Sequence, residues 1–404
     1  MKVLLVNKFH YLKGGSEKYY FELGKLLKEH GNEVAYFSMN EERNIKTGEK
    51  EYFVDPVDLN NGSKLKALDV IYSRANYKKM CEAIDDFKPD IIHLNNFQRQ
   101  LSSSVAIAAF DKKIPVVFLT HDMQAVCPNK DMMYKGKICN DCIKYGYNSC
   151  IKNKCIKNSK LKSLLGVMEA KYYKKNKIYE RMNCIISPSN FMKENLKKNG
   201  LKNNNFIVLH NFVNESNTKK LKDDNYILYF GRLSREKGIY NLLKAISNLK
   251  DVNLKIAGDG PEKENVIKFI NKKEINDRVE ILGYLNSNEI KIHISKCSFV
   301  VVPSIWYENC PYSILETIEI GKPVIASKIG GIPELIDDNE TGMLYKYDDC
   351  NELKEKIEKL YQDKKLRESM GKKARKKFEN EFSNESYYKN ITNIYMQIIG
   401  EKNV

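Results

Sequence analysis

The sequence predicts an α/β protein of two domains in tandem, each a doubly wound parallel sheet with helices on both faces. Three observations lead to this prediction. The chain has 404 residues, which at ~100–200 residues per domain is the length of two domains. Short, continuous apolar runs of strand length alternate with helical segments, as they do in parallel sheets covered on both faces. The alternation stops and restarts around residues 211–224, a polar stretch that we take as the domain boundary.

The first half opens with an apolar strand, Lys2–Val6, followed by a loop that contains Gly14, Gly15 and Ser16. A helix is predicted over Glu17–Glu29, because Ser16 is a favourable N-cap residue. A glycine pair directly after the first strand lets the backbone approach a ligand closely, although an ordinary turn is the alternative. The further strands of this half are predicted at Glu33–Phe37, Ile91–Leu94, Val116–Leu119, Cys184–Ser187 and Phe206–Leu209.

The second half repeats the scheme. Its strands are predicted at Tyr226–Phe230, Leu254–Ala257, Val279–Leu282, Phe299–Val302 and Pro323–Ser327. Its helices are predicted at Gly238–Asn248, Asn351–Gln362, Lys364–Phe378 and Ser383–Ile399. We place the domains at residues 1–212 and 213–382, with residues 383–404 packing back on the first domain. Such sheets bind ligands at the carboxyl ends of their strands, so we expect the domains to face each other across a cleft.

Composition excludes several classes of protein. Charged residues make up 30% of the chain, but apolar runs throughout argue against wholesale disorder. These runs are far shorter than the ~20 residues that span a bilayer, and the apolar stretch after Met1 and Lys2 is too short for a signal peptide. We therefore expect a cytoplasmic protein, whose ten cysteines are thiols or metal ligands rather than disulfides.

Positive charge is concentrated in one stretch. The net charge is +16, and residues 152–198 contain 13 Lys and Arg against three acidic residues. A basic surface is typical of proteins that bind nucleic acid or an anionic membrane leaflet, and a solvated helix face is the alternative. Residues 152–177 place leucines among the lysines, as amphipathic helices at membrane surfaces do. No zinc-finger, RRM or helix-turn-helix signature occurs, so we expect no nucleic-acid partner and consider peripheral binding to the anionic inner-membrane surface.

The segment Trp306–Glu316 carries the most chemistry. It follows a strand and leads into a helix whose first backbone N–H groups, near Tyr312 and Ser313, form an anion site together with the helix dipole. Glu316 within the helix is placed to accept the hydroxyls of a ribose, and Glu308 ahead of the helix those of a sugar. An anion site for a diphosphate, with a carboxylate on each side to accept sugar hydroxyls, is the arrangement that a nucleotide sugar would need. Taken alone, the two carboxylates are more simply explained as solvated residues.

Three motifs, in this order, resemble those of the retaining glycosyltransferases of family 4. They are Tyr-Phe-Gly-Arg-Leu-Ser-Arg-Glu-Lys-Gly at 229–238, the Glu308-x7-Glu316 pair, and Gly-Gly-Ile-Pro-Glu-Leu-Ile at 330–336. The resemblance extends over essentially the whole chain and implies the GT-B fold, with two Rossmann-like domains. It implies transfer of a sugar from a nucleotide-sugar donor, UDP-linked by family frequency, to a glycan or a polyprenyl-diphosphate-linked acceptor. The form of the Glu308 motif is similar to that of bacterial surface-polysaccharide enzymes. A nucleotide-sugar epimerase of GT-B fold is the alternative.

The resemblance also implies roles for individual residues. Arg232 and Lys237 would bind the donor diphosphate, where fixed cations stabilise the leaving group as a metal ion would, so no catalytic metal is expected. His121, after the strand Val116–Leu119, matches the active-site histidine of the family, and Glu308 would orient the transferred sugar. The other donor-binding residues that the resemblance implies are Gly14, Gly15, Gly283, Leu285, Asn309, Pro311, Tyr312, Ser313, Glu316 and Glu334.

Five of the ten cysteines are crowded into residues 127–155, and we expect this insert to form a wall or lid of the acceptor site. The spacing Cys139-x2-Cys142 is that of a metal knuckle, and Cys150 and Cys155 would supply the second pair of ligands. Four thiolates around a structural zinc would organise a loop that has little core of its own. Buried free thiols are one alternative, and an iron–sulfur cluster is another.

Overall fold

The structure is a computed structural model that describes residues 1–57, 66–215 and 221–402, and the chain divides into two compact units. Unit 1 contains Met1–His210 together with the chain from Tyr388 onward, and unit 2 contains Asn211–Tyr387. The division comes at the start of the polar stretch 211–224, of which residues 216–220 lie outside the described residues. The last helix, α15 (Asn384–Lys402), begins in unit 2, and most of it belongs to unit 1.

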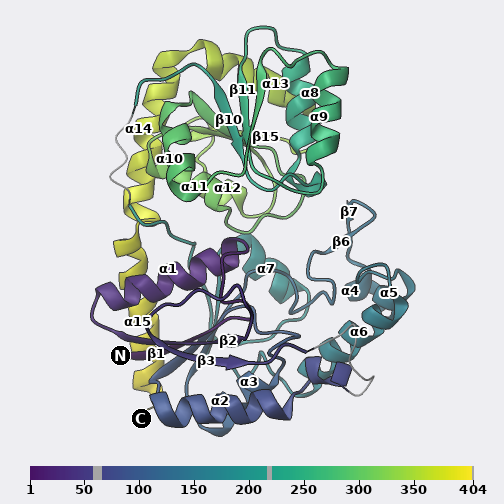
Figure 1. The fold of residues 1–404 in the computed structure, drawn as a ribbon, viewed down its shortest axis with the longest axis vertical. Helices are drawn as coiled ribbons and strands as arrows, with labels where there is room; N and C mark the ends of the chain where they lie inside the picture. Colours follow the sequence, from purple (N-terminus) through teal and green to yellow (C-terminus); the bar gives the residue numbers. More distant parts are fainter. Residues whose placement is uncertain (58–65, 216–220, 403–404) are drawn as a thin grey trace. The chain divides into compact units, whose positions relative to one another are not determined.

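Unit 1 is built on a seven-stranded sheet in the order β3-β2-β1-β4-β5-β8-β9, and every pairing in it is parallel. The strands are β1 Lys2–Val6, β2 Glu33–Met39, β3 Lys50–Val54, β4 Ile91–Leu94, β5 Val116–Leu119, β8 Cys184–Ser187 and β9 Phe206–Val208. The helices around it are α1 Gly15–Glu29, α2 Arg74–Phe87, α3 Ser104–Asp111, α6 Lys160–Lys175 and α7 Asn190–Lys198, with a short 3-10 turn, η1 Lys66–Val70. Figure 1 shows α1 and α2 on opposite sides of this sheet.

Unit 2 is built on a six-stranded parallel sheet in the order β12-β11-β10-β13-β14-β15. The strands are β10 Ile227–Phe230, β11 Leu254–Ala257, β12 Val279–Gly283, β13 Phe299–Val302, β14 Val324–Ser327 and β15 Gly342–Tyr345. The helices are α8 Ile239–Ser247, α9 Lys263–Lys272, α10 Ser287–Lys296, α11 Tyr312–Glu319, α12 Ile332–Leu335, α13 Cys350–Gln362 and α14 Lys364–Glu381, with the 3-10 turn η2 Arg235–Lys237. The prediction of two doubly wound parallel sheets is therefore confirmed.

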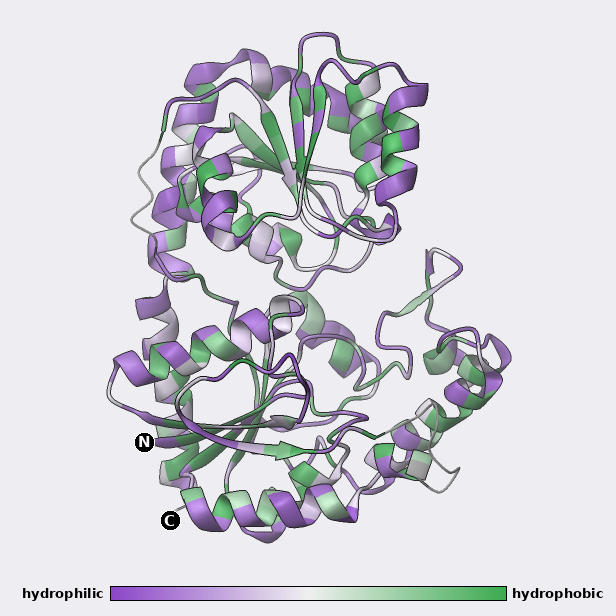
Figure 2. Ribbon diagram, viewed as in Figure 1, coloured by the Kyte–Doolittle hydropathy of each residue, from purple (hydrophilic) through white to green (hydrophobic). Residues whose placement is uncertain are grey.

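Burial explains why the apolar runs form these sheets. The residues of β4, β5, β8, β13 and β14 are buried throughout, which only continuous apolar or small residues tolerate. In Figure 2 the strands are mostly green, whereas the helices turn purple faces outward. The amphipathic helices therefore cover the sheets and present their charged faces to water.

Two strands of the large sheets and one helix cap differ from the prediction. Strand β3 went unpredicted because, at the sheet edge, its sequence Lys-Glu-Tyr-Phe-Val is buried only at the last residue. Strand β15 begins at a glycine, which sequence patterns assign to a turn; a Cβ on Gly342 would collide with the carbonyl of Val324. The prediction that Ser16 caps α1 is wrong. The helix begins two residues earlier with Gly14 at the N-cap, and the Ser16 hydroxyl donates to Glu17 instead.

The strand order of each sheet reverses at one point, and these points position the candidate site. In unit 1 the reversal lies between β1 and β4, and in unit 2 it lies between β10 and β13. The loops that leave two neighbouring strands at such a point diverge to opposite faces of the sheet and leave a crevice, which is where ligands of doubly wound sheets bind.

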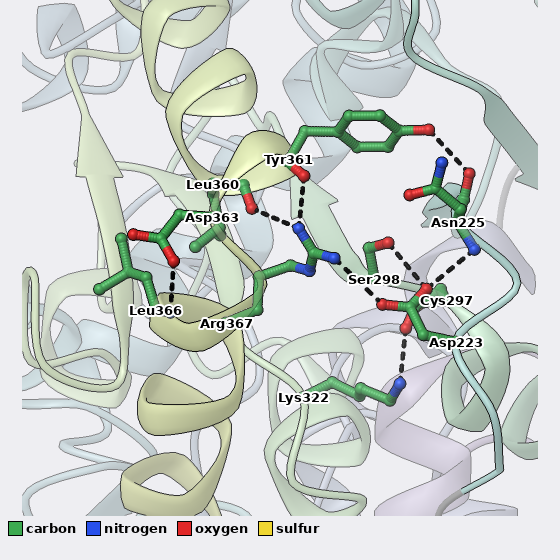
Figure 3. A network of polar contacts seen from close by, with 10 residues as sticks. All are labelled: Asp223, Asn225, Cys297, Ser298, Lys322, Leu360, Tyr361, Asp363, Leu366 and Arg367. Atoms are coloured by element: carbon green, nitrogen blue, oxygen red, sulfur yellow. Dashed lines mark hydrogen bonds and ion pairs between the residues drawn. The ribbon is translucent and has the colours of Figure 1, made fainter.

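The opposite end of the unit 2 sheet is closed by the polar network of Figure 3. Arg367 on α14 donates to the carbonyl of Leu360 at 2.9 Å and pairs with Asp223 at 3.4 Å. Asp223 also accepts hydrogen bonds of 2.9 Å from the Ser298 hydroxyl and from the backbone N–H of Asn225. The network thus joins α13 and α14 to the segments that precede β10 and β13. We assign it to stability because it lies at the amino ends of the strands.

Candidate active site

The central feature of unit 2 is an ion pair at its switch point. Lys237 ends the loop after β10 and Glu308 lies in the loop after β13, and their Nζ and Oε1 atoms are 2.6 Å apart. The same Glu308 oxygen accepts a hydrogen bond of 2.6 Å from the Ser304 hydroxyl. The Lys237 ammonium also lies 5.3 Å from the ring centroid of Trp306. The structure therefore joins two predicted site residues that are 71 positions apart in the sequence.

The environment of Glu308 keeps it ionised. Burial on its own would raise the pKa of this carboxyl, but the charge of Lys237 and the hydrogen bonds from Lys237 and Ser304 outweigh burial. The pKa of Glu308 therefore lies below its ordinary value of 4.5. Glu308 is an anion and a hydrogen-bond acceptor at neutral pH, not a proton donor.

Two glycines let the backbones around this pair approach each other. Gly238 has a φ of 70°, and a Cβ there would collide with the carbonyl of Pro303 after β13. Gly330 has a φ of 63°, and a Cβ there would collide with the backbone of Glu308. Gly331 donates its backbone N–H to the Glu308 carbonyl at 2.8 Å. The motif glycines thus allow the close backbone contacts that hold the loop carrying Glu308 in place.

Helix α11 begins directly after this loop, with Pro311 at its N-cap and no side chain capping its first N–H groups. Tyr312 and Ser313 form its first turn, at the end of the helix where the dipole favours an anion. Glu316 lies one turn later and is 9% exposed. The preceding Asn309–Cys310 segment is fixed by Asn211, whose side chain donates to the Cys310 carbonyl at 3.1 Å.

The remaining predicted donor residues lie on nearby loops of the same sheet end. Arg232 follows β10 and is exposed, and Glu334 lies on α12 and is half-buried. Gly283 ends β12, and its carbonyl accepts the backbone N–H of Gly258 after β11 at 2.7 Å. Leu285, two residues further on, is half-buried. These four positions thus share with Glu308 the end of the sheet at which the strands finish.

Unit 1 has a second polar group at its own switch point, around His121. His121 follows β5, and its Nε2 atom lies 2.9 Å from Oδ1 of Asn95, which follows β4. The Asn95 amide donates to the Val6 carbonyl, so its Oδ1 accepts and the histidine Nε2 carries the proton. Burial, and after it the charge of Lys8, lowers the pKa of His121 to about 3. The imidazole is therefore neutral, with Nδ1 as a hydrogen-bond acceptor.

Several charged residues of this group were not predicted from the sequence. Burial lowers the pKa of Lys8 to about 8, with the charge of Asp122 opposing the shift. Glu169 on α6 accepts the backbone N–H of Arg99 at 2.8 Å, and burial raises its pKa to about 7. The Arg99 guanidinium donates to the carbonyl of Pro128 at 2.7 Å. Lys8 could have been found from its place two residues after β1, but no pattern in the sequence pairs Arg99 with Glu169.

Gly14 and Gly15 are exposed at the start of α1, on the loop after β1. Gly14 is extended, with a φ of −172°, and a Cβ there would meet nothing closer than 3.7 Å. Neither backbone strain nor packing therefore requires glycine at position 14. Close approach of a ligand remains as the reason for a small residue there.

His93 has a structural role in unit 1. It is fully buried and hydrogen-bonded to Tyr395 at 2.6 Å. That bond anchors α15 in unit 1.

The predicted zinc ligands Cys139, Cys142, Cys150 and Cys155 line one small cavity in unit 1, together with Cys127. All ten cysteines lie in the described part of the chain, and each is a free thiol. No three His, Cys, Asp or Glu side chains of the described residues already form a metal-ligating group.

Among the same residues, no helix combines the length and apolar character needed to cross a membrane.

Two family models match the chain, one in each half. The model described as Glycosyltransferase Family 4 matches residues 13–217, and the model described as Glycosyl transferases group 1 matches residues 212–377.

Curated relatives are similar to parts or to nearly all of the chain. An uncharacterized glycosyltransferase of Methanocaldococcus jannaschii is 34% identical over 53% of this chain and 59% of its own length. N-acetyl-α-D-glucosaminyl L-malate synthase of Bacillus anthracis is 23% identical over 96% of this chain and 94% of its own length. The capsular polysaccharide biosynthesis glycosyltransferase CapM of Staphylococcus aureus is 27% identical over 55% and 61%. The chain thus spans about three fifths of the first and third of these relatives.

Solved structures resemble the chain over its whole length. Sucrose-phosphate synthase from Thermosynechococcus elongatus has a TM-score of 0.74 at 18% identity and covers 99% of both chains. HepE of Anabaena in complex with UDP has a TM-score of 0.71 at 17% identity, with 98% of this chain and 100% of that chain covered. These likenesses establish the GT-B fold. None of these comparisons supports the alternative of a nucleotide-sugar epimerase.

Proposed function

Because the chain belongs to glycosyltransferase family 4, we propose that it is a retaining glycosyltransferase that uses a UDP-sugar donor. The acceptor we propose is a glycan or a polyprenyl-diphosphate-linked saccharide of cell-surface polysaccharide biosynthesis. The observation that carries this proposal is the Lys237–Glu308 pair of 2.6 Å at the unit 2 switch point, directly ahead of the uncapped start of α11. A cation, a fixed carboxylate and the N-terminus of a helix are what a sugar diphosphate requires.

The donor fits this arrangement part by part. The N–H groups at Tyr312 and Ser313 would bind a phosphate, and Lys237 and Arg232 would balance the charge of the leaving diphosphate. Glu316, one turn into α11, would accept the ribose hydroxyls. UDP is supported by the complex of HepE with UDP, a protein of the same fold. The nucleobase would lie near Gly283 and Leu285 at the end of β12.

The chemistry we propose breaks the bond between the anomeric carbon and the diphosphate oxygen. The acceptor hydroxyl forms the new bond on the same face of the sugar, and its proton passes to the departing phosphate. Glu308 would orient the sugar hydroxyls because its low pKa keeps it an acceptor. Neutral His121 would accept a hydrogen bond from a sugar hydroxyl through Nδ1 rather than donate a proton. The protein thus contributes positioning and fixed charge.

We also propose that α6 brings the enzyme to an anionic membrane surface. Leu161, Leu164 and Met168 form a stripe at helical spacing and are 71%, 42% and 41% exposed. Lys160 and Lys171 are exposed on the same helix, so apolar contact and positive charge coincide. Co-sedimentation with phosphatidylglycerol vesicles should be strong, salt-sensitive and weakened by Leu161→Ser with Leu164→Ser. The control Ile292→Ser removes an exposed apolar side chain of unit 2 and should change nothing.

Fluorescence of Trp306 offers the direct test of the donor, because it is the single tryptophan and lies beside Lys237. Thermal unfolding would be followed with UDP, GDP, ADP and CMP, without added metal. A ligand at about 100 times its Kd should stabilise unit 2 by about 2.7 kcal/mol. A shift with UDP alone supports the proposed donor, and a shift with another nucleotide would replace it. No shift with any of them, in folded protein, would overturn the nucleotide site.

A further inference from the structure

The cysteine-rich insert gathers five thiols around a single space. Cys127 precedes a small hairpin, β6 Met133–Tyr134 and β7 Lys137–Ile138, and Cys139 follows it. Cys142 lies on α4 (Asp141–Tyr145) and Cys150 on α5 (Asn148–Lys152), and Cys155 follows α5. Together these thiols line a cavity of about 20 Å³. That volume holds one water molecule or one ion.

The insert has little else to hold it in one conformation. Its own apolar cluster consists of Cys150, Ile156 and Val167, with a few half-buried neighbours. The two helices are five residues each and the hairpin strands are two residues each. Elements this short are unstable in isolation. Small segments without a core are commonly stabilised by a metal ion or disulfides, and in the described chain these five thiols form no disulfide.

Backbone N–H groups surround three of the five thiols. Backbone N–H groups point at Cys127, from Met132 and Asn129, and at Cys139, from Asp141. An N–H bond of this kind also reaches Cys142, from Cys150. Backbone N–H groups directed at sulfur stabilise a thiolate, which is the form that binds metals.

Cys150 behaves differently. It is 1% exposed within the apolar cluster, where its sulfur lies within hydrogen-bond reach of Cys142 and Cys155. The other four cysteines are only half-buried, so Cys150 packs as a small apolar side chain of the cluster and the four more accessible thiols are left to bind an ion.

We propose that Cys127, Cys139, Cys142 and Cys155 bind one structural zinc ion, with Cys150 packed beside them as a hydrogen-bonding thiol. This set replaces Cys150 of the sequence-based prediction with Cys127, which only the tertiary structure brings to the cavity. Four sulfurs at about 2.3 Å form the tetrahedral site that zinc prefers. Binding releases the protons of the four thiols and draws the sulfurs inward from their present positions.

The zinc would act on the rest of unit 1 through its neighbour in the chain. Pro128 follows Cys127, and its carbonyl accepts the Arg99 guanidinium at 2.7 Å. Arg99 in turn donates its backbone N–H to Glu169 on α6. Fixing Cys127 therefore fixes Arg99 and the charged group beside His121. The zinc is structural and touches no reacting atom.

The test measures metal content in the full-length chain. Protein would be purified without chelators and assayed by plasma mass spectrometry, as wild type and as single cysteine-to-serine variants. We expect about one zinc per chain in the wild type and in Cys150→Ser, and less than a tenth of that in Cys127→Ser, Cys139→Ser, Cys142→Ser and Cys155→Ser. The matched control Cys81→Ser, a half-buried cysteine on α2, should keep its zinc. The Trp306 signal with UDP checks that unit 2 of each variant is folded.

A second measurement avoids the variants. Wild-type protein stripped with a chelator should lose thermal stability in unit 1 and regain it with Zn²⁺ but not with Mg²⁺, and Co²⁺ should give the absorption of tetrahedral cobalt thiolate. The proposal is overturned by wild-type protein that carries no zinc and does not bind it. It is also overturned by iron with inorganic sulfide, or by disulfides among the five cysteines. Loss of zinc in Cys150→Ser with retention in Cys127→Ser would overturn the ligand set.

Discussion

Replacing Lys237 by methionine should destabilise unit 2 in a way that depends on pH. Lys237→Met keeps most of the aliphatic stem over Trp306 but removes the charge that faces Glu308. In the folded protein, the Glu308 side chain is 8% exposed and the Lys237 side chain 28% exposed, so the variant leaves the carboxylate nearly buried without its cation, although Ser304 still donates to it. Leaving such a group without its partner costs about 1–3 kcal/mol. In a domain of this size that lowers the Tm by roughly 2–12 °C.

The pH dependence separates lost charge pairing from lost packing. In the wild type the pKa of Glu308 is depressed, so its contribution to stability is present above 4.5 and is lost as the pH falls through the folded pKa. Without Lys237, burial raises the pKa of Glu308 instead. As the pH falls, Glu308 takes up a proton, the buried charge disappears, and the variant no longer bears the cost of that charge. The difference in Tm between the two proteins should therefore be largest near pH 7 and shrink as the pH falls below about 5.

The measurement is thermal unfolding by Trp306 fluorescence from pH 4 to pH 8. The control is Lys263→Met, which breaks a solvent-exposed pair with Asp259 on the same unit and should shift the Tm very little. A Tm difference that stays constant over this pH range would refute the electrostatic account of the Lys237–Glu308 pair. The loss would then be assigned to packing against Trp306.

Three further outcomes are expected. Glu316→Gln should weaken UDP binding about tenfold or more in the Trp306 assay, because it removes the proposed charged acceptor of the ribose hydroxyls; unchanged affinity would remove Glu316 from the site. The pKa of about 3 for His121 predicts that titration of this residue does not change the transfer rate between pH 5 and 8. A change of rate in this pH range that disappears in His121→Asn would contradict a neutral acceptor role. Tyr395→Phe removes the 2.6 Å bond to buried His93 and should cost unit 1 about 1–3 kcal/mol, seen by circular dichroism. The same variant should leave the Trp306 transition of unit 2 in place, and a loss there instead would contradict its assignment to unit 1.

The strands that could be predicted were those whose residues are buried on both faces. Val116–Leu119 and Phe299–Val302 are apolar throughout because nothing else tolerates the middle of a covered parallel sheet. Strands β3 and β15 could not be found this way, because an edge strand needs few buried residues and a glycine start resembles a turn. The Ser16 cap failed because helix starts are decided by local backbone geometry, which a single favourable residue does not determine.

The sequence alone determined the fold class and the motif residues Lys237, Glu308 and Glu316, because local pattern and short spacings carry that information. Only the tertiary structure showed that Lys237 pairs with Glu308, that Arg99 and Glu169 meet beside Lys8, and that Cys127 joins the other cysteines. These partners are distant along the chain. Parallel strands bring them together by crossover connections, so their meeting depends on the order of the strands in the sheet, which no local pattern specifies.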